Sequence, residues 1–198
     1  MSDDELKSAI QLMRKVRKNS RGYADFFEWS PDRNQEELGV VKALSEALEA
    51  SGELYFDKIR LRGRGEDPPD CEAINQSGER IAIEVTELVD GEAIKAIKNS
   101  GNPYEWADWS KDKFRESVSH LISRKDGRFA HLKGAPYSGG YTVLLFTDEP
   151  LLNKETVGSY LASIDISKPK NIDKVFNSVV CCSNFSMYGS NAFFQCFI

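Results

Sequence analysis

The sequence has no segment that is typical of a membrane or secreted protein. Its 198 residues contain no run of about 18 apolar residues, the length that a transmembrane helix needs, so we expect no membrane partner. The N-terminal stretch Met-Ser-Asp-Asp-Glu is acidic and is followed by no apolar signal core. These absences favour a cytoplasmic protein.

Residues that commonly bind zinc are scarce, and two familiar catalytic signatures are missing. The chain has four cysteines without a Cys-x-x-Cys pair and two isolated histidines, so we expect reduced, buried thiols and no zinc site. It contains neither the Gly-x-Gly-x-x-Gly sequence of dinucleotide-binding folds nor the Gly-x-Ser-x-Gly sequence of many hydrolases. The net charge of −5 argues against a generally basic surface, so any phosphate-binding surface must be local.

The composition that is present predicts one globular domain. A hydrophobic content of 40% and a charged content of 29% are ordinary for a folded protein, and the length suits a single core. Internal repeats, low-complexity tracts and interdomain linkers are absent from the sequence. We divide the domain into an N-terminal helix with an aromatic connector (1–30), a core (31–150), and a C-terminal helix with closing strands (151–198).

The most informative stretch is an acidic β-hairpin. Two strand patterns, residues 70–74 and 80–88, flank a polar turn at 75–79 that contains Ser77-Gly78. In the second strand, apolar side chains alternate with Ala82, Glu84 and Thr86. These three side chains therefore point to a common face of the sheet.

The register of this hairpin brings two carboxylates together. Pairing Ile74 with Arg80 places Asp70 opposite Glu84, and directly opposed residues have Cβ atoms about 5 Å apart. Two carboxylates at that distance repel each other unless one is protonated or a cation lies between them. A hard divalent ion such as Mg²⁺ or Mn²⁺ is well suited to such a pair.

Further helices and strands surround the hairpin in a defined order. Apolar side chains recur at helical spacing in 34–50 and 110–125, whereas 141–147 is the nearly continuous apolar run of a strand that is covered on both faces. The predicted core is helix, strand, strand, strand, helix and strand, at 34–50, 54–64, 70–74, 80–88, 110–125 and 141–147. A helix at 151–164 and strands at 175–182 and 192–198 follow.

Pro69-Asp70, followed by a turn and then Glu84-Val85-Thr86 on a strand, resembles the motif of the PD-(D/E)xK nuclease superfamily. The order of predicted elements agrees with the αβββαβ core of that superfamily's restriction-endonuclease-like fold. The resemblance covers roughly residues 30–150. It implies an α/β fold with a mixed central sheet flanked by helices.

The resemblance also implies a metal site. Asp70 and Glu84 would bind Mg²⁺ or Mn²⁺, with the carbonyl oxygen of Val85 as a third ligand. The first core helix often supplies a further carboxylate in this superfamily, and Glu37 is our candidate for it. The alternative for Glu37 is an exposed acidic residue near the start of a helix, which needs no function.

The chain departs from the motif at the catalytic lysine, because Thr86 stands in that position. A threonine forms hydrogen bonds but carries no charge, so it cannot replace the electrostatic role of a lysine. In variants of the superfamily the following helix supplies this residue. We select Lys113 of the predicted 110–125 helix as the catalytic candidate, and Lys125 of the same helix is the other option.

A basic stripe is predicted just before the hairpin. Cations occupy every second position of the strand at 54–64 and would share one face of it, namely Lys58, Arg60, Arg62 and Arg64. The stripe either contacts the phosphate backbone of a nucleic acid beside the metal or neutralises the acidic residues of the hairpin.

Two functions follow from these patterns. The first is a metal-dependent nuclease that hydrolyses phosphodiester bonds, with DNA as the expected partner ahead of RNA. The second is a catalytically impaired relative that binds nucleic acid or a protein, with Thr86 marking the lost lysine. Whether the chain forms a homodimer is left open by the sequence.

Overall fold

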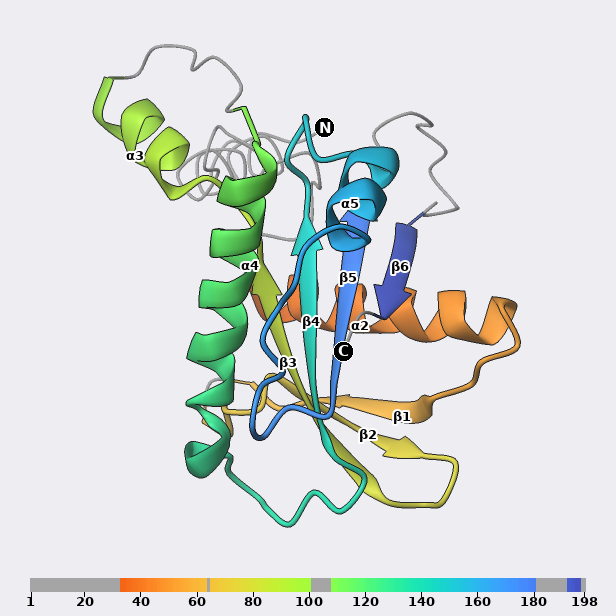
Figure 1. Ribbon diagram of the computed structural model, residues 1–198. Helices are drawn as coiled ribbons and strands as arrows, with labels where there is room; N and C mark the ends of the chain where they lie inside the picture. Colours follow the sequence, from red (N-terminus) through yellow and green to blue (C-terminus); the bar gives the residue numbers. More distant parts are fainter. Residues whose placement is uncertain (1–32, 64, 101–107, 181–191, 197–198) are drawn as a thin grey trace, which may run out of the picture.

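A mixed six-stranded sheet forms the centre of the molecule, with the strands in the order β1-β2-β3-β4-β5-β6 (Figure 1). The computed structural model describes residues 33–63, 65–100, 108–180 and 192–196. The strands are β1 (Phe56–Leu61), β2 (Cys71–Asn75), β3 (Arg80–Glu87), β4 (Tyr141–Thr147), β5 (Lys174–Val180) and β6 (Ala192–Cys196). The helices are α2 (Arg33–Ala50), α3 (Gly91–Ser100), α4 (Lys111–Asp126), the 3-10 helix η1 (Phe129–His131) and α5 (Lys154–Leu161). None of these helices is long and apolar enough to cross a membrane.

The sheet has an antiparallel part and a parallel part. Strands β1, β2 and β3 pair antiparallel in sequence order, β3, β4 and β5 run parallel, and β6 is antiparallel to β5. A parallel pair needs a crossover between its strands, and the crossover from β3 to β4 contains α3 and α4. The α/β class with a mixed sheet flanked by helices is therefore confirmed.

Helices cover both faces of this sheet, with α2 on one face and α4 and α5 on the other (Figure 1). Val41 and Leu44 of α2 belong to the same buried cluster as Ile83 of β3, whereas Val118 of α4 clusters with Ala82. Because successive strand residues point to opposite faces, Glu84 and Thr86 share the α4 face with Ala82. The sheet thus presents the carboxylate of Glu84 to α4.

The β2–β3 hairpin has the register that the sequence predicts. Ile74 pairs with Arg80, and Cys71 pairs with Ile83. The side chain of Asn75 stabilises the turn, because its Oδ1 accepts hydrogen bonds from two backbone N–H groups of the turn at 2.9 and 3.0 Å. A glycine in the turn has φ of 80°, a conformation that side-chain-bearing residues rarely adopt.

Strand β1 contradicts the predicted basic stripe. It is shorter than the expected 54–64. Asp57 pairs with Ile74 and Arg60 pairs with Glu72, so β1 advances three residues where β2 advances only two. This extra residue is a bulge, at which Lys58 has φ of 50°. An inserted residue interrupts the alternation of faces, so Lys58 and Arg60 do not follow one period-two stripe. Arg64 lies outside the described residues.

The remaining predicted elements agree with the structure to within a few residues where it describes them. The helix at 34–50 is α2, the helix at 110–125 is α4, and the strand at 141–147 is β4. The closing elements appear as α5, β5 and β6. The predicted N-terminal helix and aromatic connector (1–30) lie outside the described residues.

Candidate active site

Asp70 is fixed against β3 just before β2 begins. Its Oδ2 accepts a hydrogen bond of 2.7 Å from the backbone N–H of Val85, and the residue is 5% exposed. The hairpin register pairs Cys71 with Ile83, so one residue further it places Asp70 opposite Glu84. Glu84 is fully buried. The structure therefore brings together the two carboxylates that the sequence pairs.

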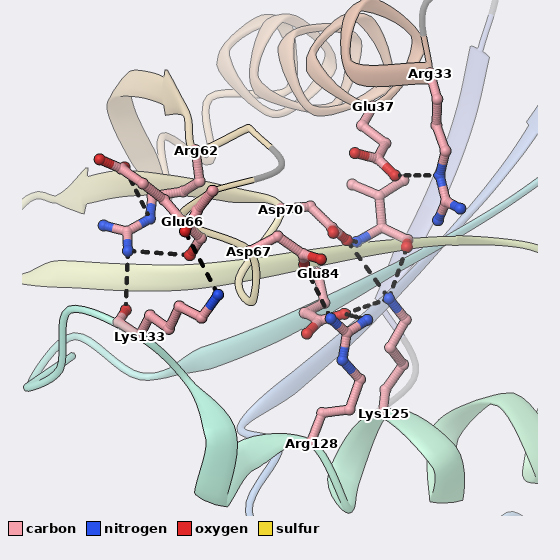
Figure 2. A network of polar contacts seen from close by, with 12 residues as sticks. Arg33, Glu37, Arg62, Glu66, Asp67, Asp70, Glu84, Lys125, Arg128 and Lys133 are labelled. Atoms are coloured by element: carbon pink, nitrogen blue, oxygen red, sulfur yellow. Dashed lines mark hydrogen bonds and ion pairs between the residues drawn. The ribbon is translucent and has the colours of Figure 1, made fainter.

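Lys125 of α4 joins the two carboxylates (Figure 2). Its Nζ donates to Glu84 Oε2, lies 2.9 Å from the carbonyl oxygen of Val85 and 3.5 Å from Asp70 Oδ2. The lysine is only 2% exposed. One ammonium group thus contacts oxygen atoms of three of the four residues that the sequence analysis proposes as metal ligands, namely Asp70, Glu84 and Val85.

The packing of α4 explains why Lys125 points inward. Phe114, Val118 and Ile122 form the buried stripe of the helix, and Lys125 is three residues beyond Ile122 on the same side. The hydroxyl of Tyr141 donates 2.9 Å to the Lys125 carbonyl oxygen and holds the last turn against the sheet. Its place on the apolar stripe is the sequence signal that favours Lys125 over Lys113.

Lys113 lies elsewhere, so its predicted placement is wrong. Its Nζ donates to Asp90 Oδ2 at 2.6 Å and to the Asp108 carbonyl oxygen at 3.2 Å, and it sits over the ring of Trp109. At 1.5 Å per residue, its position on α4 is about 18 Å along the helix axis from Lys125. Lys113 immediately precedes the stripe residue Phe114, so it faces away from the stripe.

Thr86 is buried beside the last turn of α4. It is 7% exposed, and its Oγ1 accepts a hydrogen bond of 3.3 Å from Nη2 of Arg124. The threonine therefore contacts a cation from the same turn that carries Lys125. Thr86 of β3 and the last turn of α4 are therefore in direct contact.

Glu37 enters the site from the opposite layer, as Figure 2 shows. It is 8% exposed, and its Oε1 accepts a hydrogen bond of 2.7 Å from Arg33 Nε. Burial, and then the charge of Asp70, raises the pKa of Glu37 to about 7, against the opposing effect of Arg33. The predicted third carboxylate is thus electrostatically coupled to Asp70.

Arg128, which follows α4, is a site residue that the sequence patterns do not identify. Its Nη1 lies 3.0 Å from Glu84 Oε2, and its Nη2 donates to Asp67 Oδ1 at 2.9 Å. It stands beyond the end of the helix, where helical spacing no longer predicts the direction of a side chain. The backbone conformation of the residues after Asp126 therefore determines whether Arg128 reaches Glu84.

A cavity of about 280 Å³ adjoins the carboxylates. Its walls come from α2, from the segment before β2, and from the segment after α4. The lining residues are Arg33, Asn34, Glu37, Gly63, Asp67, Asp70 and Arg128. Arginine and acidic side chains therefore both face a space that is large enough for a small polar group.

The electrostatics of the buried pair favour a cation. Burial raises the pKa of Asp70 and of Glu84, and Lys125 counteracts that effect at both carboxylates. The second oxygen of Glu84, Oε1, is buried and receives no hydrogen bond from the described residues. An unsatisfied carboxylate oxygen of this kind remains available as an acceptor or a ligand.

The oxygen atoms of Asp70, Glu84 and Val85 are of the chemical type that Mg²⁺ or Mn²⁺ takes as ligands. Among the described residues, no group of three His, Cys, Asp or Glu side chains is gathered closely enough to hold a metal without help. Mg²⁺ does not require such a group, because it often takes one or two protein carboxylates together with water and substrate phosphate. Asp70 and Glu84 with the Val85 carbonyl oxygen provide that smaller set.

The arginines of the basic stripe contact acidic residues. Arg60 Nε lies 2.7 Å from Glu72 Oε1, and Arg62 Nη1 lies 3.1 Å from Glu72 Oε2. Partial burial of Glu72 raises its pKa, but hydrogen bonds from Arg60 and Arg80 outweigh this and lower it to about 2. These contacts support the second of the two interpretations of the stripe, neutralisation of the acidic hairpin.

Comparisons of the chain with protein-family models, with curated proteins and with solved structures find no match in any of the three. The relation to the PD-(D/E)xK superfamily therefore stays a resemblance. It rests on the motif residues and on the geometry described above.

Proposed function

We propose that this protein is a Mg²⁺- or Mn²⁺-dependent nuclease that hydrolyses phosphodiester bonds in DNA. The observation that carries the proposal is the convergence of Asp70, Glu84 and the Val85 carbonyl oxygen on one buried point. That point adjoins a polar cavity with arginines on its walls. Paired carboxylates beside a phosphate-sized cavity suit metal-assisted hydrolysis.

The arrangement of the sheet supports the same proposal. Helix α2 precedes an antiparallel β1–β2–β3 meander, and β4 then joins β3 in parallel after α4. We take this as the restriction-endonuclease-like αβββαβ core, with α3 inserted before α4. The acidic residues stand at its second and third strands, where the motif requires them.

Each residue has a distinct task in this proposal. Asp70, Glu84 and Val85 would hold the divalent ion, and Glu37 would complete the site from α2. The bound ion supplies a more acidic water and offsets negative charge on the phosphate. Lys125 would orient the attacking water and stabilise the charge that develops on the phosphate oxygens. A buried ammonium is effective in this role, because little solvent screens it.

One observation favours the second candidate, a nucleic-acid- or protein-binding relative without hydrolytic activity. The ammonium of Lys125 already contacts the proposed ligand oxygen atoms of Asp70, Glu84 and Val85. A lysine in that position can neutralise the carboxylates permanently, as an internal replacement for the metal. The two candidates therefore differ in whether a divalent ion binds beside Lys125.

Thermal unfolding with and without Mn²⁺, together with cleavage of a labelled duplex, tests the proposal. Mn²⁺ should raise the melting temperature of the wild type by mass action but not that of Asp70→Asn. Asp67→Asn is the matched control, because Asp67 lines the same cavity and contacts Arg128 but is not a proposed ligand. No stabilisation and no cleavage in the wild type would favour the binding protein.

A further inference from the structure

Arg128 forms two ion pairs and lines a cavity that is large enough for a phosphate group. Its guanidinium contacts Glu84 on one side and Asp67 on the other, at 3.0 and 2.9 Å. The side chain of Arg128 is 33% exposed, so it is accessible from the cavity that it lines. Arg128 is thus a second cation beside Glu84, in addition to Lys125.

Of the two ion pairs of Arg128, the one with Asp67 exchanges readily, whereas the one with the fully buried Glu84 exchanges only if other cations compensate the charge of that carboxylate. Asp67 is 42% exposed, and ion pairs between solvated groups contribute about 0–1 kcal/mol. Glu84 also accepts a hydrogen bond from Lys125, so its charge is shared between two cations. A carboxylate that binds a divalent ion attracts a guanidinium still less.

The charges around the cavity change sign when a cation is added. Four acidic side chains, of Glu37, Asp67, Asp70 and Glu84, stand against three basic ones, of Arg33, Lys125 and Arg128. The sum is one negative charge if all are ionised, and a divalent cation would make it one positive charge. An anion such as a phosphodiester then becomes the favoured occupant of the cavity.

We propose that Arg128 binds a backbone phosphate of the nucleic acid, exchanging its carboxylate partners for phosphate oxygens. The planar guanidinium matches two phosphate oxygens at once, which a lysine cannot do. Arg33, on the α2 side of the same cavity, is less suited to this role, because its side chain is 74% exposed and its Nε is bonded to Glu37. This inference rests on the proposed nuclease function.

Duplex binding measured against salt concentration tests the inference without relying on activity. We would follow the fluorescence anisotropy of a labelled duplex, with Ca²⁺ replacing Mg²⁺ so that binding is measured apart from cleavage. Arg128→Met should weaken binding about tenfold, and should lower the slope of log affinity against log salt by about one. Arg115→Met is the matched control, because Arg115 is an α4 arginine of similar exposure that pairs with Asp112. It should bind as the wild type does.

Two further measurements separate a phosphate contact from other roles. The loss in Arg128→Met should be the same for duplexes of unrelated sequence, and a sequence-dependent loss would overturn the phosphate assignment. Arg128→Lys keeps the charge but not the two-pronged geometry, so its affinity should fall while its salt slope stays near that of the wild type. If Arg128→Met does not fold, Arg128→Lys alone decides, and wild-type affinity in it overturns the inference.

The failure of this inference is distinguishable from the failure of the proposed function. If Mn²⁺ stabilises the wild type and the duplex binds, an unchanged salt slope in Arg128→Met overturns the role of Arg128 alone. If the wild type neither gains stability from Mn²⁺ nor binds a duplex, the nuclease proposal is wrong and the phosphate role of Arg128 is wrong with it.

Discussion

Lys125 and Glu84 connect helix α4 to the central sheet, because the ammonium at the end of α4 reaches the fully buried carboxylate of β3. The same ammonium contacts Asp70 and the Val85 carbonyl oxygen. A buried carboxylate pair held by one lysine is sensitive to the loss of that lysine. This relationship gives the sharpest predictions about the protein.

We expect Lys125→Met to lower the free energy of unfolding by about 3–5 kcal/mol without metal, because it leaves two buried carboxylates without their main counter-charge. Mn²⁺ should then stabilise the variant more than it stabilises the wild type, while duplex cleavage is lost. Chemical denaturation with and without Mn²⁺ measures the first two effects. Lys113→Met, at the other end of α4, should retain cleavage and lose about 1 kcal/mol or less. Equal cleavage by wild type and Lys125→Met would contradict the role of Lys125.

Glu37 should make the protein less stable as the pH rises. Its pKa is about 7 in the fold, mainly because it is buried, against an ordinary value of 4.5 in an unfolded chain. The folded state therefore binds more protons than the unfolded state between these values, so stability falls as pH rises through this window. Below the window both states are protonated and the penalty is absent.

The variant Glu37→Gln tests this dependence, because it removes the titrating group and keeps its shape. The stability of Glu37→Gln relative to the wild type should increase between about pH 4.5 and pH 7, and then level off. Urea denaturation across this range measures the difference, and Glu36→Gln, on the same turn of α2, serves as the control. A relative stability that does not change with pH would show that Glu37 titrates normally.

The hairpin could be predicted from the sequence because its constraints are local. A polar turn and alternating apolar residues set the register of Ile74 with Arg80, and the register sets the pairing of Asp70 with Glu84. The bulge in β1 could not be predicted, since an inserted residue leaves no mark in a pattern of alternating charge. It is the reason that the predicted stripe of cations does not share one face.

The identity of the site lysine was partly predictable. The helical spacing that buries Val118 and Ile122 also directs Lys125 inward, so the stripe itself favours Lys125 over Lys113. Arg128 had no such signal, because it follows the end of the helix and its direction is set by tertiary packing. Sequence periodicity therefore locates side chains within elements but not in the segments between them.

The basic residues of β1 should contribute little to duplex binding. Arg60 contacts both Glu66 and Glu72, so its charge is largely compensated within the protein. We expect Lys58→Ala combined with Arg60→Ala to leave the salt slope of duplex binding unchanged. Anisotropy titrations in Ca²⁺ measure this slope. A decrease of about one unit per residue would instead assign these cations to phosphate contacts.

Moving the lysine from α4 back to the strand is the strictest test of the resemblance. Thr86 and Glu84 share a sheet face, and a lysine side chain extends about 6 Å, or roughly two residues of extended backbone. In a Lys125→Met background, Thr86→Lys should therefore recover part of the lost cleavage. The recovery should increase when Arg124 is also replaced by alanine, because Arg124 contacts Thr86 and would repel the new ammonium.

The control for this exchange is Thr86→Met in the same background, which adds similar volume without charge. Duplex cleavage in Mg²⁺ under single-turnover conditions measures each variant, and Mn²⁺ stabilisation confirms that the metal site is intact. Recovery with lysine but not with methionine would show that the site needs a cation and accepts it from either element. Mn²⁺ stabilisation without recovery in any lysine variant would mean that the position on α4, and not the charge alone, determines activity.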